Sequence, residues 1–552
     1  MKDIKGNNVA ELFVKCLEKE GVQYIFGVPG EENLVFLEAI RESSIRLIIT
    51  RDEQGACFMA AAVGRLTGKI GVALSTLGPG ATNLMTGIAY AQLGGMPILV
   101  ITGQKPLKKS KQGLFQIIDT VRMMEPLTKY TTTIKSPDRV ASIVREAVKI
   151  AESERPGAVH IELPEDIASE AAEGEPIVQE KIRRPVPDEK SIKIVVDALE
   201  KSLHPVILLA SGANRKLVRK QLRLFLEKTS IPFITTQMGK GVEDETSPLY
   251  MGTTALSGGD YVHKILSSAD TVIVIGHDIN EKPPAILTRD MQTIIHVNFS
   301  QADVDEVYIP THEIVGDISN ALWQITESIT VPLSWDFSYF RSVRNSYEKS
   351  ILVSDTYTSF PVRPERLVSD VRKIMPHDGI LSLDNGMYKI WFARDYRAFE
   401  QNSVILDNAL ATMGAGLPVG IATKLLNPDK KVLVVAGDGG FMMNVAEIET
   451  AQRLGLDLVI LILNDSGYGM ISWKQRDMGL PDFGLAFSNP DFVILAESFG
   501  AKGYKIKNAE DLAPILRQAI NSKGIHIIDC PVDYSHNVEV LGEGLRKEIQ
   551  TL

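Results

Sequence analysis

The stretch KKVLVVAGDGGFMMNVAEIETAQRLGLDLVILILND, residues 430–465, determines the predicted fold. KVLVVAG (431–437) is a continuous apolar run that is typical of a buried strand, and MNVAEIETAQRLG (443–455) is predicted to be the helix that follows it. LVILILN (458–464) is predicted to be the next buried strand. A strand, a helix and a strand in this order indicate a right-handed crossover between two parallel strands.

Polar residues follow both of these strands. Asp438 and Asn464 are therefore expected to emerge together at the carboxyl edge of one sheet, where open α/β sheets bind ligands. Glycines 437, 439 and 440 allow backbone N–H groups to approach an anion at the helix N-terminus. A carboxylate, a side-chain amide and a backbone carbonyl supply oxygen ligands that suit Mg²⁺, which usually retains water and phosphate oxygens. The pattern predicts a metal-bridged diphosphate.

Two alternatives apply to this motif. GDGG by itself is also a common turn, in which the aspartate is a turn or cap residue. The glycine pattern GDGGFM lacks the last glycine of the dinucleotide fingerprint G-x-G-x-x-G. The spacing of one helix and one strand between Gly437 and Asn464 is what favours the metal site.

The same alternation of apolar strands and helical patterns runs through nearly the whole chain, which at 552 residues is too long for one core. Continuous apolar strands separated by helices indicate parallel sheets covered on both faces. Polar, proline-bearing stretches at 170–190 and 331–365 are predicted linkers. We therefore expect three doubly wound α/β domains, at residues 1–170, 188–332 and 360–552. A short internal echo, TLGPG (76–80) and TMGAG (412–416), is weak evidence for duplication between the first and third domains.

Composition excludes several classes of protein. The net charge is −10, and the local lysine cluster at 108, 109 and 111 is no basic face, so nucleic acid is not expected as a partner. The N-terminus lacks a secretory apolar core, and no apolar run is long enough to span a membrane. The cysteines form no metal-binding or disulfide pattern, which indicates a reducing cytosol; they are Cys16, Cys57 and Cys530.

The GDG motif followed at this interval by ND resembles the signature of thiamine diphosphate enzymes. The similarity extends over nearly the whole chain. VKCLEKEGVQYIFGVPGEEN, TRDEQGACFMAAAVGRLTGKIGVALSTLGPGATN, ERPGAVHIELPEDI and NALATMGAGLPVGIA resemble the acetohydroxyacid synthase and pyruvate oxidase branch, and the acetolactate synthases most of all.

This resemblance implies a subunit with a pyrimidine-binding, a central and a diphosphate-binding domain. It implies a homodimer or homotetramer whose active sites lie between subunits. The implied reaction is decarboxylation of pyruvate and carboligation to a second pyruvate, giving 2-acetolactate and CO₂, with thiamine diphosphate and Mg²⁺ as cofactors.

The resemblance also implies residue roles. Glu53 matches the glutamate that hydrogen-bonds N1′ of the cofactor, Met413 the apolar wedge that bends it, and Gln116 a glutamine near the reacting carbon. A surface glutamate, a core methionine and a solvent-facing glutamine are the alternatives. The implied metal ligands are Asp438, Asn464 and the backbone carbonyl of Ser466. The other implied cofactor contacts are Val28, Pro29, Gly30, Thr76, Pro79, Asn83, Gly386, Met387, Tyr388, Gly437, Gly439, Gly440, Tyr468, Gly469 and Met470.

The chain departs from the family pattern at several places. It has no adjacent pair of histidines, which favours carboligation over aldehyde release. GHDINEK (276–282) replaces the arginine-rich run of the flavin-binding synthases, so FAD is possible but not expected. Lys474 stands where biosynthetic enzymes have a tryptophan, which favours pyruvate as acceptor, although the neighbouring Trp473 weakens that alignment. Glu31 and Glu32 replace small residues and keep a different acceptor or donor open, although two carboxylates at the start of a helix are the alternative.

Three alternative functions are weighed against the resemblance, and each explains only part of the sequence. The first is another thiamine diphosphate-dependent 2-oxoacid decarboxylase, lyase or carboligase with a different substrate. The second is a non-enzymatic diphosphate-binding regulator, and the third, a nicotinamide oxidoreductase, is disfavoured by the missing glycine fingerprint. The sequence does not determine the acceptor, a regulatory subunit, or a biosynthetic as opposed to a catabolic pathway.

Overall fold

The computed structural model describes residues 7–108, 113–178, 184–215, 217–282, 285–290, 292–332, 334–352 and 356–552. The chain forms two compact units. Unit 1 comprises Met1–Ile182, Ala409–Pro428 and Asn444–Leu456, and unit 2 comprises Arg183–Asn408, Asp429–Met443 and Asp457–Leu552. Lys109, Lys111 and part of the predicted 170–190 linker lie outside the described residues, whereas Lys108 is exposed.

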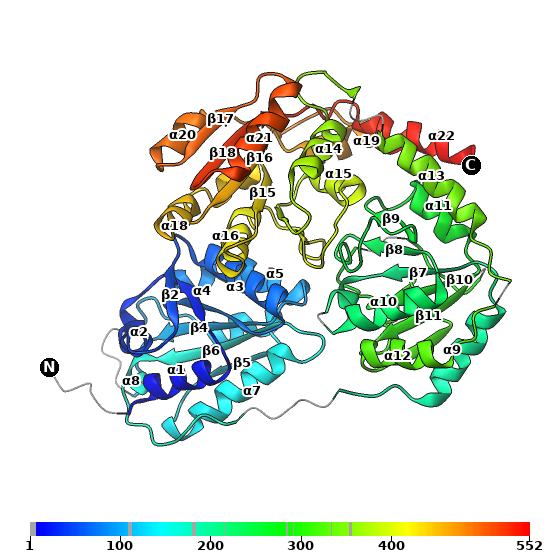
Figure 1. Ribbon diagram of the computed structural model, residues 1–552. Helices are drawn as coiled ribbons and strands as arrows, with labels where there is room; N and C mark the ends of the chain where they lie inside the picture. The colour runs from blue at the N-terminus through cyan, green and yellow to red at the C-terminus, as the bar shows by residue number, and fades with distance from the viewer. Residues whose placement is uncertain are drawn as a thin grey trace. The chain divides into compact units, whose positions relative to one another are not determined.

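Unit 1 contains a six-stranded sheet of order β2-β1-β3-β4-β6-β5 (Figure 1). All of its strand pairs are parallel, and the central strands are buried along their whole length because both faces are covered by helices. The strands are β1 (Tyr24–Gly27), β2 (Arg46–Ile49), β3 (Gly71–Ser75), β4 (Ile98–Gln104), β5 (Tyr130–Thr133) and β6 (Ala158–Pro164).

The helices of unit 1 cover this sheet on two sides (Figure 1). Apolar residues of α1 (Val9–Lys19), α2 (Leu34–Arg41), α7 (Val140–Glu152) and α8 (Glu165–Ala168) form one core with the strands. On the other side, α3 (Glu53–Thr67) and α5 (Met85–Leu93) pack together, and α3 also packs against α16 (Gly416–Leu426). The remaining helices of the unit are α4 (Pro79–Asn83), α6 (Thr120–Met124) and α18 (Glu447–Arg453).

The first sheet of unit 2 has the order β12-β11-β10-β7-β8-β9, which is the Rossmann arrangement 3-2-1-4-5-6 read from the other edge. Its strands are β7 (Pro205–Leu209), β8 (Phe233–Thr236), β9 (Tyr250–Thr254), β10 (Thr271–Ile275), β11 (Thr293–Asn298) and β12 (His312–Val315). The helices α9 (Glu189–Lys201), α10 (Val218–Thr229) and α12 (Ile318–Ser328) share its core, and α11 (Tyr261–Ser268) and α13 (Ser338–Leu352) pack against β9. The predicted linker 331–365 therefore contains a helix, α13.

The second sheet of unit 2 has the order β14-β13-β15-β16-β18-β17. Its strands are β13 (Ile380–Leu383), β14 (Val404–Ile405), β15 (Val432–Gly437), β16 (Leu458–Asn464), β17 (Lys502–Lys505) and β18 (Ile525–Pro531). Its helices are α14 (Pro364–Ile374), α15 (Met387–Asp395), α17 (Asp438–Met443), α19 (Gly469–Asp477), α20 (Phe492–Ser498), α21 (Leu512–Asn521) and α22 (Gly544–Gln550).

Three parallel sheets with flanking helices confirm the predicted fold class. The sheet of unit 1 and the β13–β18 sheet have the same strand order, which agrees with the internal echo between TLGPG and TMGAG. The two strands of the 430–465 stretch pair in parallel, as predicted. The helix predicted at 443–455 is the shorter α18 (Glu447–Arg453), and a separate helix that was not predicted, α17 (Asp438–Met443), begins directly after β15. The predicted domain boundaries remain predictions.

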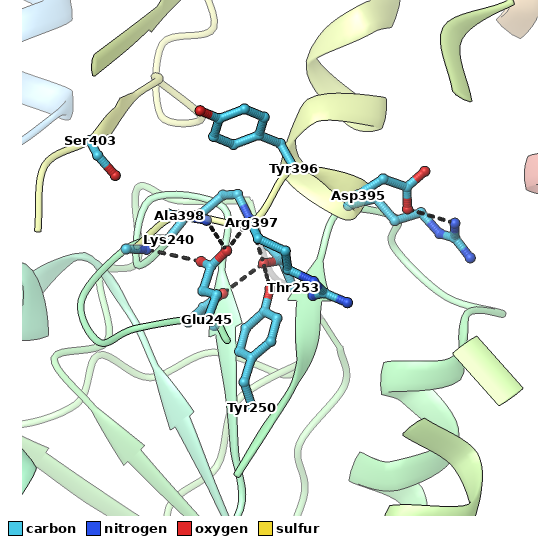
Figure 2. A network of polar contacts seen from close by, with 12 residues as sticks. Lys240, Glu245, Tyr250, Thr253, Asp395, Tyr396, Arg397, Ala398 and Ser403 are labelled. Carbon is cyan, nitrogen blue, oxygen red and sulfur yellow. Dashed lines mark hydrogen bonds and ion pairs between the residues drawn. The ribbon is translucent and has the colours of Figure 1, made fainter. Parts of the chain in front are cut away.

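A buried polar network joins the Rossmann-like sheet of unit 2 to the chain after α15 (Figure 2). Glu245 accepts hydrogen bonds from Lys240 Nζ (2.7 Å) and the Ala398 amide (2.8 Å), and neither charged side chain is exposed. Beside it, Tyr250 and Thr253 share a hydrogen bond, and the Arg397 guanidinium lies over the Tyr250 ring. Because the buried Lys240 and Glu245 side chains pair with each other, this network can hold the two parts of unit 2 together away from solvent.

None of the described helices combines the length and the apolar composition that a membrane crossing requires.

Candidate functional site

Glu53, the predicted catalytic glutamate, is the first residue of α3. The helix begins here because the Asp52 side chain caps it by accepting a hydrogen bond from the Gln54 amide (2.7 Å). The Glu53 carboxylate is almost fully buried, and its Oε2 accepts a hydrogen bond from Asn83 Nδ2 (3.0 Å). The structure therefore brings together two predicted site residues, Glu53 and Asn83.

Thr76 and the glycines around it lie at the same edge of the sheet. A Cβ atom on Gly80 would lie 3.0 Å from Thr76 Cγ2 and 3.1 Å from Glu53 Oε1. A Cβ atom on Gly30 would lie 2.3 Å from Thr76 Cβ, so only glycine allows the turn after β1 to approach Thr76 so closely. The carboxyl ends of β1 and β3 thus meet at the topological switch point of the sheet, where ligands bind in such folds.

The other predicted residues of the first domain lie on the same loops. Val28 is partly buried and Pro29 is exposed in the turn that leads to Gly30, and Pro79 is the exposed first residue of α4. The Gln116 backbone has φ +58° and packs against Gly78, where a Cβ atom would lie 3.0 Å from the Gln116 carbonyl oxygen. Gln116 therefore reaches this edge through its backbone, while its side chain is exposed.

Met413 belongs to unit 1 together with Glu53. The link between their segments is Asn444, whose side-chain amide donates to Gln54 Oε1 (3.2 Å) and to the Gly414 carbonyl (2.9 Å). Met413 itself is partly buried, and Gly414 after it has φ +86°. The structure places the neighbours of Met413 and Glu53 in contact through one buried asparagine.

Glu447, like Asn444, is a residue of this site that the sequence did not predict. It is fully buried and accepts hydrogen bonds from the amides of Arg51 (2.9 Å) and Asp52 (3.2 Å), directly before Glu53. Burial raises the pKa of Glu447, and these hydrogen bonds oppose the rise. The only signal in the sequence is an asparagine and a glutamate in the stretch NVAEIE (444–449), whose pattern predicts no more than a helix.

The three predicted metal ligands converge in unit 2. Asp438 is buried at the start of α17, directly after β15, and its Oδ2 accepts a hydrogen bond from the Ser466 amide (2.8 Å). Asn464 ends the adjacent strand β16, and its Oδ1 accepts a hydrogen bond from Ser466 Oγ (3.3 Å). The φ of +52° at Ser466 turns the chain back toward Asp438. The Ser466 carbonyl accepts one long bond (3.4 Å) from the Phe487 amide, which leaves a lone pair for another partner.

Asn489 lies between two of these ligands and was not predicted. Its Nδ2 donates to Asp438 Oδ2 (2.7 Å) and to Asn464 Oδ1 (3.2 Å). Because one N–H group donates to both of these oxygens, the two acceptors face the same point, and a cation would be stabilised there. Burial raises the pKa of Asp438, and hydrogen bonds from Asn489, Gly439 and Ser466 counteract the rise.

The predicted diphosphate residues surround Tyr388. Met387 and Tyr388 begin α15, and Gly386 is its N-cap residue. The Tyr388 ring packs so closely on Gly386 and Gly437 that Cβ atoms there would lie 2.4 Å and 3.1 Å from its Cε1. Gly439 donates its amide to Asp438 Oδ1 (2.9 Å), and Gly440 is buried in the same turn. A side chain at Gly386 would force the buried Tyr388 ring to move, and one at Gly437 would press on the same ring.

A cavity of about 420 Å³ opens beside Ser466. Its lining includes Asp465, Tyr468, Gly469, Trp473 and Arg476. Met470, partly buried, follows Gly469 in α19. Burial, together with the charge of Asp438, raises the pKa of Asp465 to about 7. A Cβ atom on Gly469 would lie 2.6 Å from Asp465 Oδ2, so this glycine also permits a close approach.

These residues fit a magnesium ion and a diphosphate. The donor set is one carboxylate, one amide oxygen and one backbone carbonyl, which suits a hard cation that completes its shell with phosphate and water oxygens. No group of three or more His, Cys, Asp or Glu side chains suited to a metal occurs in the described part of the chain. Gly437, Gly439 and Gly440 have no side chains, so phosphate oxygens can approach the backbone amides of this turn.

Comparison with known proteins identifies the family to which the chain belongs. The models of the thiamine pyrophosphate enzyme family match three segments: the N-terminal TPP binding domain at residues 7–123, the central domain at 192–325 and the C-terminal TPP binding domain at 384–530.

Similar proteins extend over nearly the whole chain. Acetolactate synthase of Bacillus subtilis (strain 168) is 32% identical over 100% of this chain and 98% of its own length. The catabolic acetolactate synthase of Raoultella terrigena is 33% identical over 97% of this chain and 96% of its own length. The probable acetolactate synthase large subunit of Methanocaldococcus jannaschii is 31% identical over 97% and 94%. The chain belongs to the thiamine pyrophosphate enzymes and is an enzyme of the acetolactate synthase type.

Proposed function

We propose that this enzyme is an acetolactate synthase that uses thiamine diphosphate and Mg²⁺. It removes CO₂ from pyruvate and joins the remaining two-carbon unit to a second pyruvate, giving 2-acetolactate. The observation that carries the proposal is the convergence of Asp438, Asn464 and Ser466 at two adjacent strand ends. The similarity to acetolactate synthases over the whole chain supports it.

Asp438, Asn464 and the Ser466 carbonyl would hold Mg²⁺. A diphosphate would complete the shell of the metal, and Gly437, which has no side chain, would let it approach the backbone. Thiamine diphosphate, when bound, supplies the carbon nucleophile on which a 2-oxoacid is decarboxylated. The protein would position the cofactor and supply the electrostatic field around it, because the buried carboxylate of Asp438 beside the metal fixes the charge of the site.

Glu53 would hold a hydrogen bond to N1′ of the pyrimidine ring. Asn83 fixes one of its carboxylate oxygens, so the other remains available for this bond. Met413 would support the bent shape of the cofactor, and Asn444 keeps the Met413 segment next to the Glu53 segment. Gln116, at the same edge as Thr76, would donate to the carbonyl of the substrate. Excluding water and proton donors from this edge favours carbon–carbon bond formation over aldehyde release.

We also propose that the central domain holds no FAD. Glu281 is buried where a ligand would meet the carboxyl edge of this sheet, and it accepts hydrogen bonds from Thr236 Oγ1 and the Met238 amide (both 2.8 Å). The cavity beside Glu281 and His277 has a volume of about 10 Å³, enough for one water molecule. The buried, hydrogen-bonded Glu281 and the small cavity beside it support a central domain without a flavin.

The proposal includes a homodimer or homotetramer with active sites between subunits, as the resemblance to the family implies. Sedimentation velocity of the purified protein with thiamine diphosphate and Mg²⁺ measures this assembly. A monomeric species with full activity contradicts it.

The test of the function is a panel of 2-oxoacids with product identification. Purified protein is incubated with thiamine diphosphate, Mg²⁺ and millimolar pyruvate, and acetolactate, CO₂ and aldehyde are measured separately. We expect acetolactate from pyruvate alone and no flavin absorbance. Cofactor binding without acetolactate, and with turnover of another 2-oxoacid, would assign the enzyme to a different substrate.

A further inference from the structure

A buried acid of the unit 1 sheet joins three other elements to β6. Glu162 is only 5% exposed and accepts hydrogen bonds from three neutral groups, which are Gln104 Nε2 (2.9 Å), Thr133 Oγ1 (2.8 Å) and Thr120 Oγ1. Gln104 and Thr133 belong to the neighbouring strands β4 and β5, whereas Thr120 is the first residue of α6. A buried polar network whose members are all hydrogen-bonded makes the elements that it joins rigid. Glu162 therefore ties the start of α6 to the sheet.

The segment directly before α6 is held at the same place. Gln104 Nε2, which donates to Glu162, also donates to the Ile118 carbonyl oxygen (3.4 Å). The Thr120 amide donates to the same carbonyl (3.0 Å), and the Thr120 side chain is completely buried. Residues 118–120 are thus fixed by contacts from both their backbone and their side chains, and these contacts meet at Glu162.

The loop that ends at this anchor carries Gln116, a predicted site residue. The side chains before it are open to solvent, with Leu114 83% and Phe115 63% exposed. The Gln116 backbone packs on Gly78, where a Cβ atom would lie 3.0 Å from the Gln116 carbonyl oxygen. Gln116 is only two residues from Ile118, so its place against Gly78 depends on the anchor.

A similar row of hydrogen bonds on the same face of the sheet joins strands to each other and provides a comparison. His160 lies two positions before Glu162 on β6, so both side chains point to one face. Its ring nitrogens bond Thr102 Oγ1 and Thr131 Oγ1 (both 2.8 Å), which belong to β4 and β5. Burial lowers the pKa of His160 to about 3, so the ring is neutral at neutral pH. Of these two rows, the one at Glu162 reaches α6.

We propose that Glu162 is a positioning residue that anchors residues 118–120 and thereby holds Gln116 against the turn at 78–80, beside Glu53. The anchored loop favours carboligation over aldehyde release. A displaced loop would carry Gln116 away from the substrate and admit water to this edge of the sheet. The inference rests on the proposed function, in which Gln116 donates to the carbonyl of the substrate.

Two threonine-to-valine variants test the proposal. Thr120→Val removes the hydroxyl that joins α6 to Glu162, and Thr131→Val, the matched control, removes a hydroxyl that bonds His160. Each purified variant is given thiamine diphosphate, Mg²⁺ and pyruvate, and acetolactate and aldehyde are measured separately. We expect the ratio of acetolactate to aldehyde to fall about 3- to 10-fold in Thr120→Val, the value of one hydrogen bond. In Thr131→Val we expect the ratio to stay within about twofold, because a general loss of stability affects both products alike.

Hydrogen exchange measures the anchor without substrate or cofactor. We expect the amides of residues 113–120 to exchange about 3- to 10-fold faster in Thr120→Val than in the unsubstituted protein, because the loop opens more often. Thr131→Val should leave their exchange unchanged. Glu162→Gln keeps an oxygen that accepts from Gln104 and Thr120, and its NH₂ group can donate to Thr133 Oγ1. This variant is expected to retain slow exchange and the product ratio of the unsubstituted enzyme.

Equal product ratios in Thr120→Val and Thr131→Val, or equal exchange of residues 113–120 in these two variants, would overturn the inference and leave the proposed function intact. Fast exchange in Glu162→Gln would also overturn it, because the acceptor for Thr120 is still present. Failure of the unsubstituted enzyme to form acetolactate would overturn both the proposed function and the inference.

Discussion

The side-chain amide of Asn489 donates a 2.7 Å hydrogen bond to Asp438 Oδ2. The same nitrogen also donates to Asn464 Oδ1 (3.2 Å). Asn489 lies 25 residues beyond Asn464 in the chain, so only the fold brings it to this place. It orients both proposed side-chain ligands of the metal, and orienting groups of this kind affect metal affinity strongly.

Asn489→Leu is therefore expected to weaken Mg²⁺ binding about 10- to 100-fold, the usual effect of removing a group that orients metal ligands. The measurement is a Mg²⁺ titration of activity, and of cofactor binding, at fixed thiamine diphosphate. Ser488→Ala changes the exposed neighbouring residue and serves as the control. Equal Mg²⁺ dependence in Asn489→Leu and the unsubstituted enzyme would show that the amide plays no part in metal binding.

Glu53→Gln is expected to reduce kcat by about 10² to 10⁴, the range for loss of a proton-transferring group. The amide retains an oxygen that accepts the hydrogen bond from Asn83, so folding and cofactor binding should persist. Steady-state kinetics with pyruvate, together with circular dichroism, measure both. Undiminished activity in this variant would favour a non-catalytic diphosphate-binding protein.

The sequence predicts those parts of the fold and site that depend on local pattern. The buried strands β15 and β16 and the polar residues at their ends follow from continuous apolar runs and from the spacing of Asp438 and Asn464. Asn489 and Glu447 could not be predicted in this way, because their roles depend on hydrogen bonds to residues 51 and 395 positions away in the chain. For the buried Lys105–Glu32 ion pair the sequence shows only that Glu32 is an unexpected acid beside the predicted contacts Val28 to Gly30. Its partner Lys105 lies 73 positions away, so the pairing depends on the fold.

Lys240→Met tests the buried network of unit 2. Lys240 and Glu245 are completely buried, so removing the ammonium leaves an uncompensated carboxylate, a change that costs about 3–5 kcal/mol. We expect a lower midpoint of urea unfolding for the part of the chain that contains the Rossmann-like sheet. Lys474→Met removes a lysine that is 53% exposed and should leave the midpoint unchanged. An equal midpoint in the two variants would mean that the Lys240–Glu245 pair does not stabilise the fold.

Glu281 makes the stability of unit 2 depend on pH. Burial raises the pKa of Glu281 from 4.5 to about 7, although hydrogen bonds from Met238 and Thr236 oppose the rise. Between these two values the folded state binds a proton that the unfolded state does not bind, so this group destabilises the fold progressively as the pH rises from about 4.5 to about 7. The full effect is at most about 3 kcal/mol. Glu281→Gln cannot ionise; its amide oxygen keeps the hydrogen bond from the Met238 amide, and its NH₂ group can donate to Thr236 Oγ1 in place of the bond that Oε2 accepts. Unfolding midpoints of both proteins measured from pH 5 to pH 8 should therefore diverge, with the variant gaining relative stability as the pH rises. Parallel pH profiles would show that Glu281 ionises equally in the folded and unfolded chain.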